Sequence, residues 1–240
     1  MYIDLSREVS EWVFNNSSSE KKKGSNQYSA MIAVMVGESE RYLSDDIEWD
    51  LMGTSNKVTV WKMKKSSLKM KKEDNDWPCV KSSTIIGIDP KFLAEYLSDS
   101  TKVEEYNRYC AGRSDIEQLS GNSKIVWNRL NIPIGIKPYD FCTLIHRYSK
   151  PMKNEIYIIS KCIKHPSVPE NNHYGRSEKI IGINILRSLK PEARNGGPRT
   201  EITCISHQRY ANTPPIMIEK SMMRGKINYL RKLREVQENK

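Results

Sequence analysis

The stretch DFCTLIHRYSKPMKNEIYIISKCI, residues 140–163, contains two segments of strand type and decides the fold class. Its two parts, DFCTLIHRY and EIYIISKCI, are rich in the β-branched and aromatic residues that favour strands. One such segment precedes them, KIVWNRL at 124–130, and two follow, RSEKIIGINIL at 176–186 and TEITCISHQ at 200–208. The sequence therefore predicts five successive strands.

The segments before these strands predict helices and three more strands. Residues 28–43 place apolar side chains at helical spacing, and residues 47–63 predict two strands around a Gly-Thr-Ser-Asn turn. A third strand is expected near 78–86. Asp89 and Pro90 then have the types preferred at an N-cap and at the first helical position, and we expect helical character to continue to about residue 118.

A last helix is expected after Thr213 and Pro214, with an apolar stripe at Met223, Ile227, Leu230 and Leu233. Eight strands without β-α-β alternation, closed by this helix, predict an α+β fold with an antiparallel sheet and segregated helices. Residues 1–27 are interpreted as a short helix and a flexible linker, and residues 28–240 as the globular domain.

The composition indicates a folded, basic protein. The chain has 240 residues, a net charge of +10 and 38% hydrophobic residues, and no run of about 18 apolar residues that would cross a membrane. The N-terminus lacks the apolar core of a signal peptide, so we expect a cytoplasmic protein. The five cysteines include no CxxC pair, which argues against a disulfide framework or a zinc ribbon.

Residues 161–176, KCIKHPSVPENNHYGR, gather possible metal ligands: Cys162, His165, Glu170 and His173. A structural zinc site needs four ligands, and Cys162 ends a strand where a thiol is ordinary. We therefore favour a proline-stiffened loop and expect no metal or other cofactor.

Other chemistries lack their motifs. The sequence has no GxSxG nucleophile elbow, no P-loop and no GxGxxG turn. Its basic clusters suit either nucleic acid or anionic membrane, but they lack the interleaved aromatic residues of stacking modules, so no nucleic-acid partner is expected. A curved sheet, a closing amphipathic helix and no catalytic constellation suggest a container for a small apolar ligand.

Four motifs in order resemble the START family, the steroidogenic acute regulatory related lipid transfer domains, and are most similar to its phosphatidylcholine-transfer type. They lie at Trp49–Trp61, Asp89–Leu97, Lys137–Phe141 and His165–Arg176. The resemblance implies a helix-grip fold, in which a curved sheet and the C-terminal helix enclose a lipid tunnel. It also implies a monomeric, non-enzymatic carrier of a phospholipid, peripherally associated with membranes.

The resemblance places an incomplete aromatic cage for a choline group. Trp127 and Phe141 match two cage positions, whereas Ile180 stands at a third, normally aromatic one, and the phosphate-binding arginine of such carriers falls near Val103. The positions of the acid and the arginine of sterol carriers are Val126 and Ile145, so phospholipid is favoured over sterol.

Strand alternation suggests other head-group residues. Arg129 shares a face with Trp127, Arg176 follows the His-Pro loop, and Asn184 and Thr143 are candidates for the lipid oxygens. Alternatively, Arg129 and Arg176 pair with Asp140 or Glu178. The predicted lipid-binding set comprises Trp127, Arg129, Phe141, Thr143, Ile145, Arg176, Ile180, Asn184, Met223, Ile227 and Leu230.

The last helix also carries the expected membrane contact. Gly225 is a candidate hinge, and six basic residues are expected to meet an anionic surface: Lys220, Arg224, Lys226, Arg231, Lys232 and Arg234. A lipid-sensing or tethering module, a sterol or ceramide carrier, and an enzyme of the wider helix-grip superfamily remain alternatives.

Overall fold

The fold was determined as a computed structural model that describes residues 25–67, 72–131, 137–192 and 196–238. Its helices are α2 (Ser25–Tyr42), α3 (Lys72–Asn75), α4 (Pro90–Ser98), α5 (Val103–Tyr106) and α6 (Pro215–Glu238), with short 3₁₀ turns at Ser100–Lys102 and Pro151–Lys153. The strands are β1 (Trp49–Ser55), β2 (Val58–Met63), β3 (Cys79–Ile86), β4 (Cys110–Ser120), β5 (Ser123–Leu130), β6 (Tyr139–Lys150), β7 (Glu155–Cys162), β8 (Gly175–Arg176), β9 (Glu178–Leu189) and β10 (Arg199–Arg209).

One sheet contains all the described strands. Its order is β1-β2-β3-β10-β9-β7-β6-β5-β4, and every neighbouring pair in that order is antiparallel. The two-residue strand β8 pairs with β6 in parallel. The predicted α+β class with a large antiparallel sheet and a C-terminal helix is confirmed.

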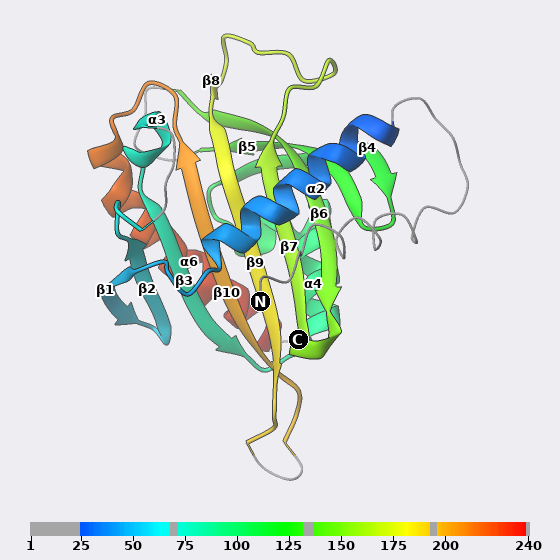
Figure 1. The fold of residues 1–240 in the computed structure, drawn as a ribbon, viewed down its shortest axis with the longest axis vertical. Helices are drawn as coiled ribbons and strands as arrows, with labels where there is room; N and C mark the ends of the chain where they lie inside the picture. The colour runs from blue at the N-terminus through cyan, green and yellow to red at the C-terminus, as the bar shows by residue number, and fades with distance from the viewer. Residues whose placement is uncertain (1–24, 68–71, 132–136, 193–195, 239–240) are drawn as a thin grey trace, which may run out of the picture.

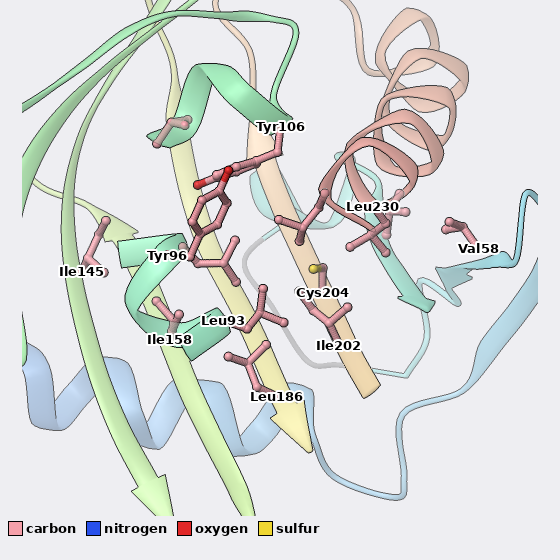
Figure 2. Packing of buried hydrophobic residues seen from close by; sticks show 14 of the residues in the cluster. Val58, Leu93, Tyr96, Tyr106, Ile145, Ile158, Leu186, Ile202, Cys204 and Leu230 are labelled. Carbon is pink, nitrogen blue, oxygen red and sulfur yellow. The ribbon is translucent and has the colours of Figure 1, made fainter. Parts of the chain in front are cut away.

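Helices cover both faces of the curved sheet (Figure 1). Helix α2 crosses one face, which we call the outer face, where its Met35 and Tyr42 are buried with Ile125 and Leu144. Helices α4, α5 and α6 cover the opposite, inner face. There they enclose a second apolar cluster, in which Leu93 and Leu230 pack with Ile202 and Leu186 of the sheet (Figure 2).

The predicted starts of the first two helices are close to those in the structure. Asp89 caps α4, its carboxylate accepting hydrogen bonds from the backbone N–H groups of Lys91 and Phe92. Helix α2 begins at Ser25, so residues 25–27 of the expected linker are helical. Residues 1–24, which include the predicted N-terminal helix, lie outside the described part of the chain.

The expectation of helical character up to residue 118 was wrong. Helix α5 ends at Tyr106, and residues 110–120 form β4, an edge strand. The strand was missed because its sequence, CAGRSDIEQLS, has few β-branched or aromatic residues. Backbone pairing with β5, interrupted by three register shifts, holds it in place instead.

Candidate ligand-binding cavity

A cavity of about 210 Å³ lies between the inner face of the sheet and helices α4, α5 and α6. Its wall is amphiphilic. The apolar part includes Leu97, Val103, Leu130, Phe141, Ile145, Ile158 and Met222, and the neutral polar part includes Asn107, Asn128, Ser160, Asn184, Ser206, Gln208 and Ser221. Four tyrosines, Tyr106, Tyr109, Tyr210 and Tyr229, complete much of the remainder.

Four of the predicted lipid-binding residues face this cavity or lie directly behind its wall. Phe141, Ile145 and Asn184 line it. Thr143, between Phe141 and Ile145 on the same face of β6, is fully buried, and its Oγ1 is 3.3 Å from Nδ2 of the lining residue Asn128. Phe141, Thr143 and Ile145 therefore all face the inner side of the sheet, as alternation along β6 predicts.

Trp127 and Arg129, two residues of the predicted head-group site, lie outside the cavity wall. In β5 it is Asn128 and Leu130 that line the cavity, whereas Trp127 packs in the outer cluster. The Arg129 guanidinium lies over the Trp127 ring, 4.7 Å from its centroid, and donates to Ser114 Oγ. Both faces of β5 are buried here, so apolar character gave no sign of which face was the inner one.

Arg176 is held by an ion pair instead of facing the cavity. Its Nε and Nη2 each lie 2.8 Å from an oxygen of Asp140, a carboxylate only 1% exposed. The Asp140 carboxylate also accepts a hydrogen bond from Nε1 of Trp127, at 2.9 Å. Charge-assisted, two-point pairing of this kind fixes both partners, so the alternative role of Arg176 as a structural partner is the one observed.

A β-bulge in β9 removes Ile180 from the predicted site and puts Lys179 in it. His207 of β10 pairs with Ile181, but the next residue, Gln208, pairs with Lys179, so Ile180 is the extra residue of the bulge. Lys179, Gly182 and Asn184 all line the cavity. Simple alternation from Asn184 points to Ile180, and the bulge shifts the inner face by one position.

The face of helix α6 that packs against the sheet is slightly rotated relative to the predicted apolar stripe. Leu230 and Leu233 are buried in the inner cluster as expected, whereas Met223 and Ile227 are only half-buried at its margin. The residues of α6 that line the cavity are Ser221, Met222, Gly225, Lys226 and Tyr229.

The six basic residues of α6 do not form one surface. Lys226 lines the cavity, Arg231 pairs with Glu235 at 2.6 Å, and Arg234 donates to the backbone oxygen of Asn56. Lys220, Arg224 and Lys232 are exposed.

Three cationic side chains of the cavity were missed by the sequence analysis: Arg113 of β4, Lys179 of β9 and Lys226 of α6. The pKa of Lys179 is lowered to about 8, mainly by burial and to a smaller extent by the charges of Lys226 and Arg113, against the opposing effect of the Cys162 thiol. Burial also lowers the pKa of Lys226. In the sequence these residues lie among many other basic ones, so nothing marked them as internal.

The apparent metal ligands around His165 are separate in the fold. Cys162 Sγ is 3.0 Å from the backbone nitrogen of Lys179, and His165 Nε2 is 3.2 Å from a carboxylate oxygen of Glu117. The described residues contain no group of three or more side chains placed to hold a metal ion. Burial raises the pKa of the Cys162 thiol, which keeps it protonated.

The fold and its internal cavity define a helix-grip protein, and solved structures similar to it include lipid transfer domains. Human StAR-related lipid transfer protein 5 superposes with a TM-score of 0.75 at 12% identity, covering 89% of this chain and 98% of that one. Human STARD10 gives a TM-score of 0.68 at 17% identity over 93% of this chain and 82% of that one. The lipid transfer and protein localization domain of human StarD13 gives 0.66 at 12% identity, covering 84% and 94%.

At these identities the likeness establishes the fold. No protein-family model matches the sequence, and no curated protein does. Within the described residues, no helix is both long and apolar enough to span a bilayer.

Proposed function

We propose that this protein binds one lipid molecule in its internal cavity and carries it between membranes without covalent chemistry. The observation that carries the proposal is the amphiphilic cavity between the sheet and α6, in which apolar walls suit an acyl chain and polar groups suit a head group. The similarity in fold to lipid transfer domains supports it.

Lipid entry on this proposal requires α6 to move. The cavity of about 210 Å³ lies below the roughly 300–1,000 Å³ typical of ligand pockets. An acyl chain in water is disfavoured by about 0.8 kcal/mol per CH₂ group relative to an apolar environment, so the cavity has to shield the chain while the protein is between membranes. Helix α6 is the element that closes the cavity from one side.

The exposed side of α6 suits contact with a membrane surface. Ile216 and Met217 are 82% and 54% exposed near its start, and Lys220 and Arg224 are exposed one and two turns further on. Met217, Lys220 and Arg224 share a helix face, since residues three, four or seven apart align. Apolar side chains beside lysine and arginine fit an anionic lipid surface.

Phosphatidylcholine was expected from the resemblance to carriers whose choline cage falls at Trp127, Phe141 and Ile180, with Arg129 as a candidate for the phosphate. Phe141 lines the cavity, whereas Trp127 and Arg129 lie away from its wall. The proposal therefore keeps a phospholipid carrier, with its head-group preference set by other residues.

Transfer of fluorescent phospholipids between donor and acceptor liposomes, together with native mass spectrometry of the purified protein, tests the proposal. We expect a co-purified or loaded lipid at one molecule per chain and protein-dependent transfer. Binding without transfer favours the sensing or tethering alternative, and absence of binding to any lipid overturns the proposal.

A further inference from the structure

The cavity contains positive charge without a matching negative charge. Arg113, Lys179 and Lys226 reach its wall from three different elements, whereas no Asp or Glu occurs among its lining residues. Several lysines elsewhere in the described residues have carboxylate partners, as in Lys62–Glu219 and Lys124–Asp115. The cavity wall therefore has a positive charge that no acidic lining residue balances.

The three cations also lack partners of opposite charge. Among the residues that the structure describes, no carboxylate lies within ion-pair distance of any of them. Arg113 Nη1 is 3.4 Å from the backbone oxygen of Leu97, and its buried Nε makes no hydrogen bond. The Lys226 ammonium lies 5.8 Å from the centroid of the Tyr229 ring, which is a weak interaction.

The local backbone makes room for one of these cations. The bulge at Ile180 turns Lys179 to the inner face, and its stem runs past Gly182. A Cβ at Gly182 would lie 3.1 Å from Cδ of Lys179 and 2.6 Å from Oγ of Ser160. The bulge and the glycine thus place a partly buried lysine on the inner face, where an ammonium without a counter-charge is unfavourable.

Like charges in an enclosed space repel each other and lose hydration, so the unliganded cluster destabilises the fold. An anion among the three cations reverses both effects, because it supplies the missing charge and accepts their hydrogen bonds. A choline phospholipid brings a quaternary ammonium together with its phosphate, so it adds no net negative charge and compensates the three cations less well.

We propose that the cavity selects an amphiphile with a net negative head group, whose phosphate or carboxylate oxygens lie between Arg113, Lys179 and Lys226. The acyl part then lies along the apolar wall formed by Ile145, Ile158 and Met222. This inference rests on the proposed lipid-binding function and specifies its ligand class.

Competitive loading tests the proposal. The full chain is incubated with three sets of vesicles, in which phosphatidylcholine is mixed equally with phosphatidic acid, with phosphatidylglycerol or with oleate. The protein is then separated from the vesicles, and its bound lipid is quantified by mass spectrometry. We expect enrichment of an anionic lipid over phosphatidylcholine, and the three sets distinguish a phosphate monoester, a phosphodiester and a carboxylate as the source of the charge.

Lys179→Met and Lys226→Met are the informative variants, and Lys91→Met, which removes an exposed lysine of helix α4 that does not line the cavity, is the matched control. Because a hydrogen bond to a charged group is a strong contributor to binding, each cavity variant is expected to lower the anionic-to-choline lipid ratio about tenfold or more. The control should keep the wild-type ratio. A circular dichroism spectrum like that of the wild type confirms that each variant folds.

Lipid bound without preference, or a preference that survives both cavity substitutions, overturns the proposed selectivity and leaves lipid binding intact. A chain that takes up none of the four lipids overturns the proposed function itself.

Discussion

Arg176 and Asp140 form a two-point ion pair that joins β8 to β6, with both N–O distances at 2.8 Å. Arg176 also donates to the backbone oxygens of Val168 and Pro169, at 3.2 and 3.1 Å. The pair therefore ties the proline-containing loop before β8 to the sheet. Arg176, which follows the loop in sequence, thus anchors that loop to the sheet.

Arg176→Ala is expected to lower the free energy of unfolding by about 3–5 kcal/mol, since it leaves the buried Asp140 carboxylate without its cation. Denaturant titration measures the loss. Arg199→Ala is the comparison, because Arg199 pairs with a Glu192 side chain that is 76% exposed, and such pairs contribute about 0–1 kcal/mol. Equal effects of the two substitutions would show that the Asp140 pair is not the anchor.

Lys179→Met is expected to stabilise the unliganded protein at neutral pH by at least about 1 kcal/mol, because it removes an ammonium whose burial is unfavourable. In the wild type the Lys179 pKa of about 8 lies below its ordinary 10.5, owing to burial and to Lys226 and Arg113, against the opposing effect of the Cys162 thiol. Between pH 8 and 10.5 the unfolded chain holds a proton that the folded protein has released. Stability of the unliganded wild type should therefore rise with pH in this window.

Unfolding curves at several pH values check this, and a Lys179→Met profile with the same rise as the wild type would contradict it. A bound anion should raise the Lys179 pKa and move the rise to higher pH.

Acidification should destabilise the protein through His146. Burial lowers the pKa of His146 to about 4 from 6.5, and its Nδ1 lies 2.8 Å from Ser123 Oγ. As the pH falls from 6.5 to 4, the unfolded chain takes up a proton that the folded protein excludes, so the free energy of unfolding decreases.

His146→Gln should flatten part of this dependence, measured by denaturant titration between pH 7 and 4. Burial also lowers the pKa of His207, so a residual slope remains in the variant. The prediction fails if the two proteins lose stability in parallel.

Gly225→Ala tests whether α6 bends during lipid exchange. A Cβ at Gly225 would have Tyr109 Cε2 as its nearest described neighbour, at an ordinary 3.8 Å, and alanine favours a helix interior by about 1 kcal/mol relative to glycine. We expect a more stable protein with unchanged lipid occupancy and slower transfer between liposomes. Unchanged transfer would remove the hinge role.

The paired substitution Ile216→Glu and Met217→Glu should reduce transfer from anionic vesicles while leaving lipid bound in the cavity, since it places carboxylates on the exposed apolar start of α6. Met152→Glu is the control, because Met152 is 98% exposed but lies on the turn between β6 and β7. Similar losses of transfer in both proteins would argue against a specific membrane-facing surface.

The strands β5, β6, β7, β9 and β10 were predictable because their β-branched and aromatic residues are dense. The facing of β5 was not, because Ile125 and Val126 are neighbours in sequence and both are fully buried, on opposite faces. Alternation along a strand shows which residues share a face. It does not show which face is the inner one when protein covers both faces of the sheet.

The cavity cations were unpredictable for two other reasons. Arg113 belongs to an edge strand without strand-type composition, and Lys179 depends on a bulge whose register is set by the neighbouring strand β10. By contrast, Phe141 and Ile145 lie on a regular strand, and both line the cavity as predicted.

Two of the three cavity cations, Arg113 and Lys179, are fixed to the sheet, whereas Lys226 belongs to α6. Any swing of α6 away from the sheet therefore carries off a third of the charge around a bound anion and admits water to the rest. The same movement would open the cavity and weaken its binding of an anionic head group, so α6 would control both lipid access and head-group affinity.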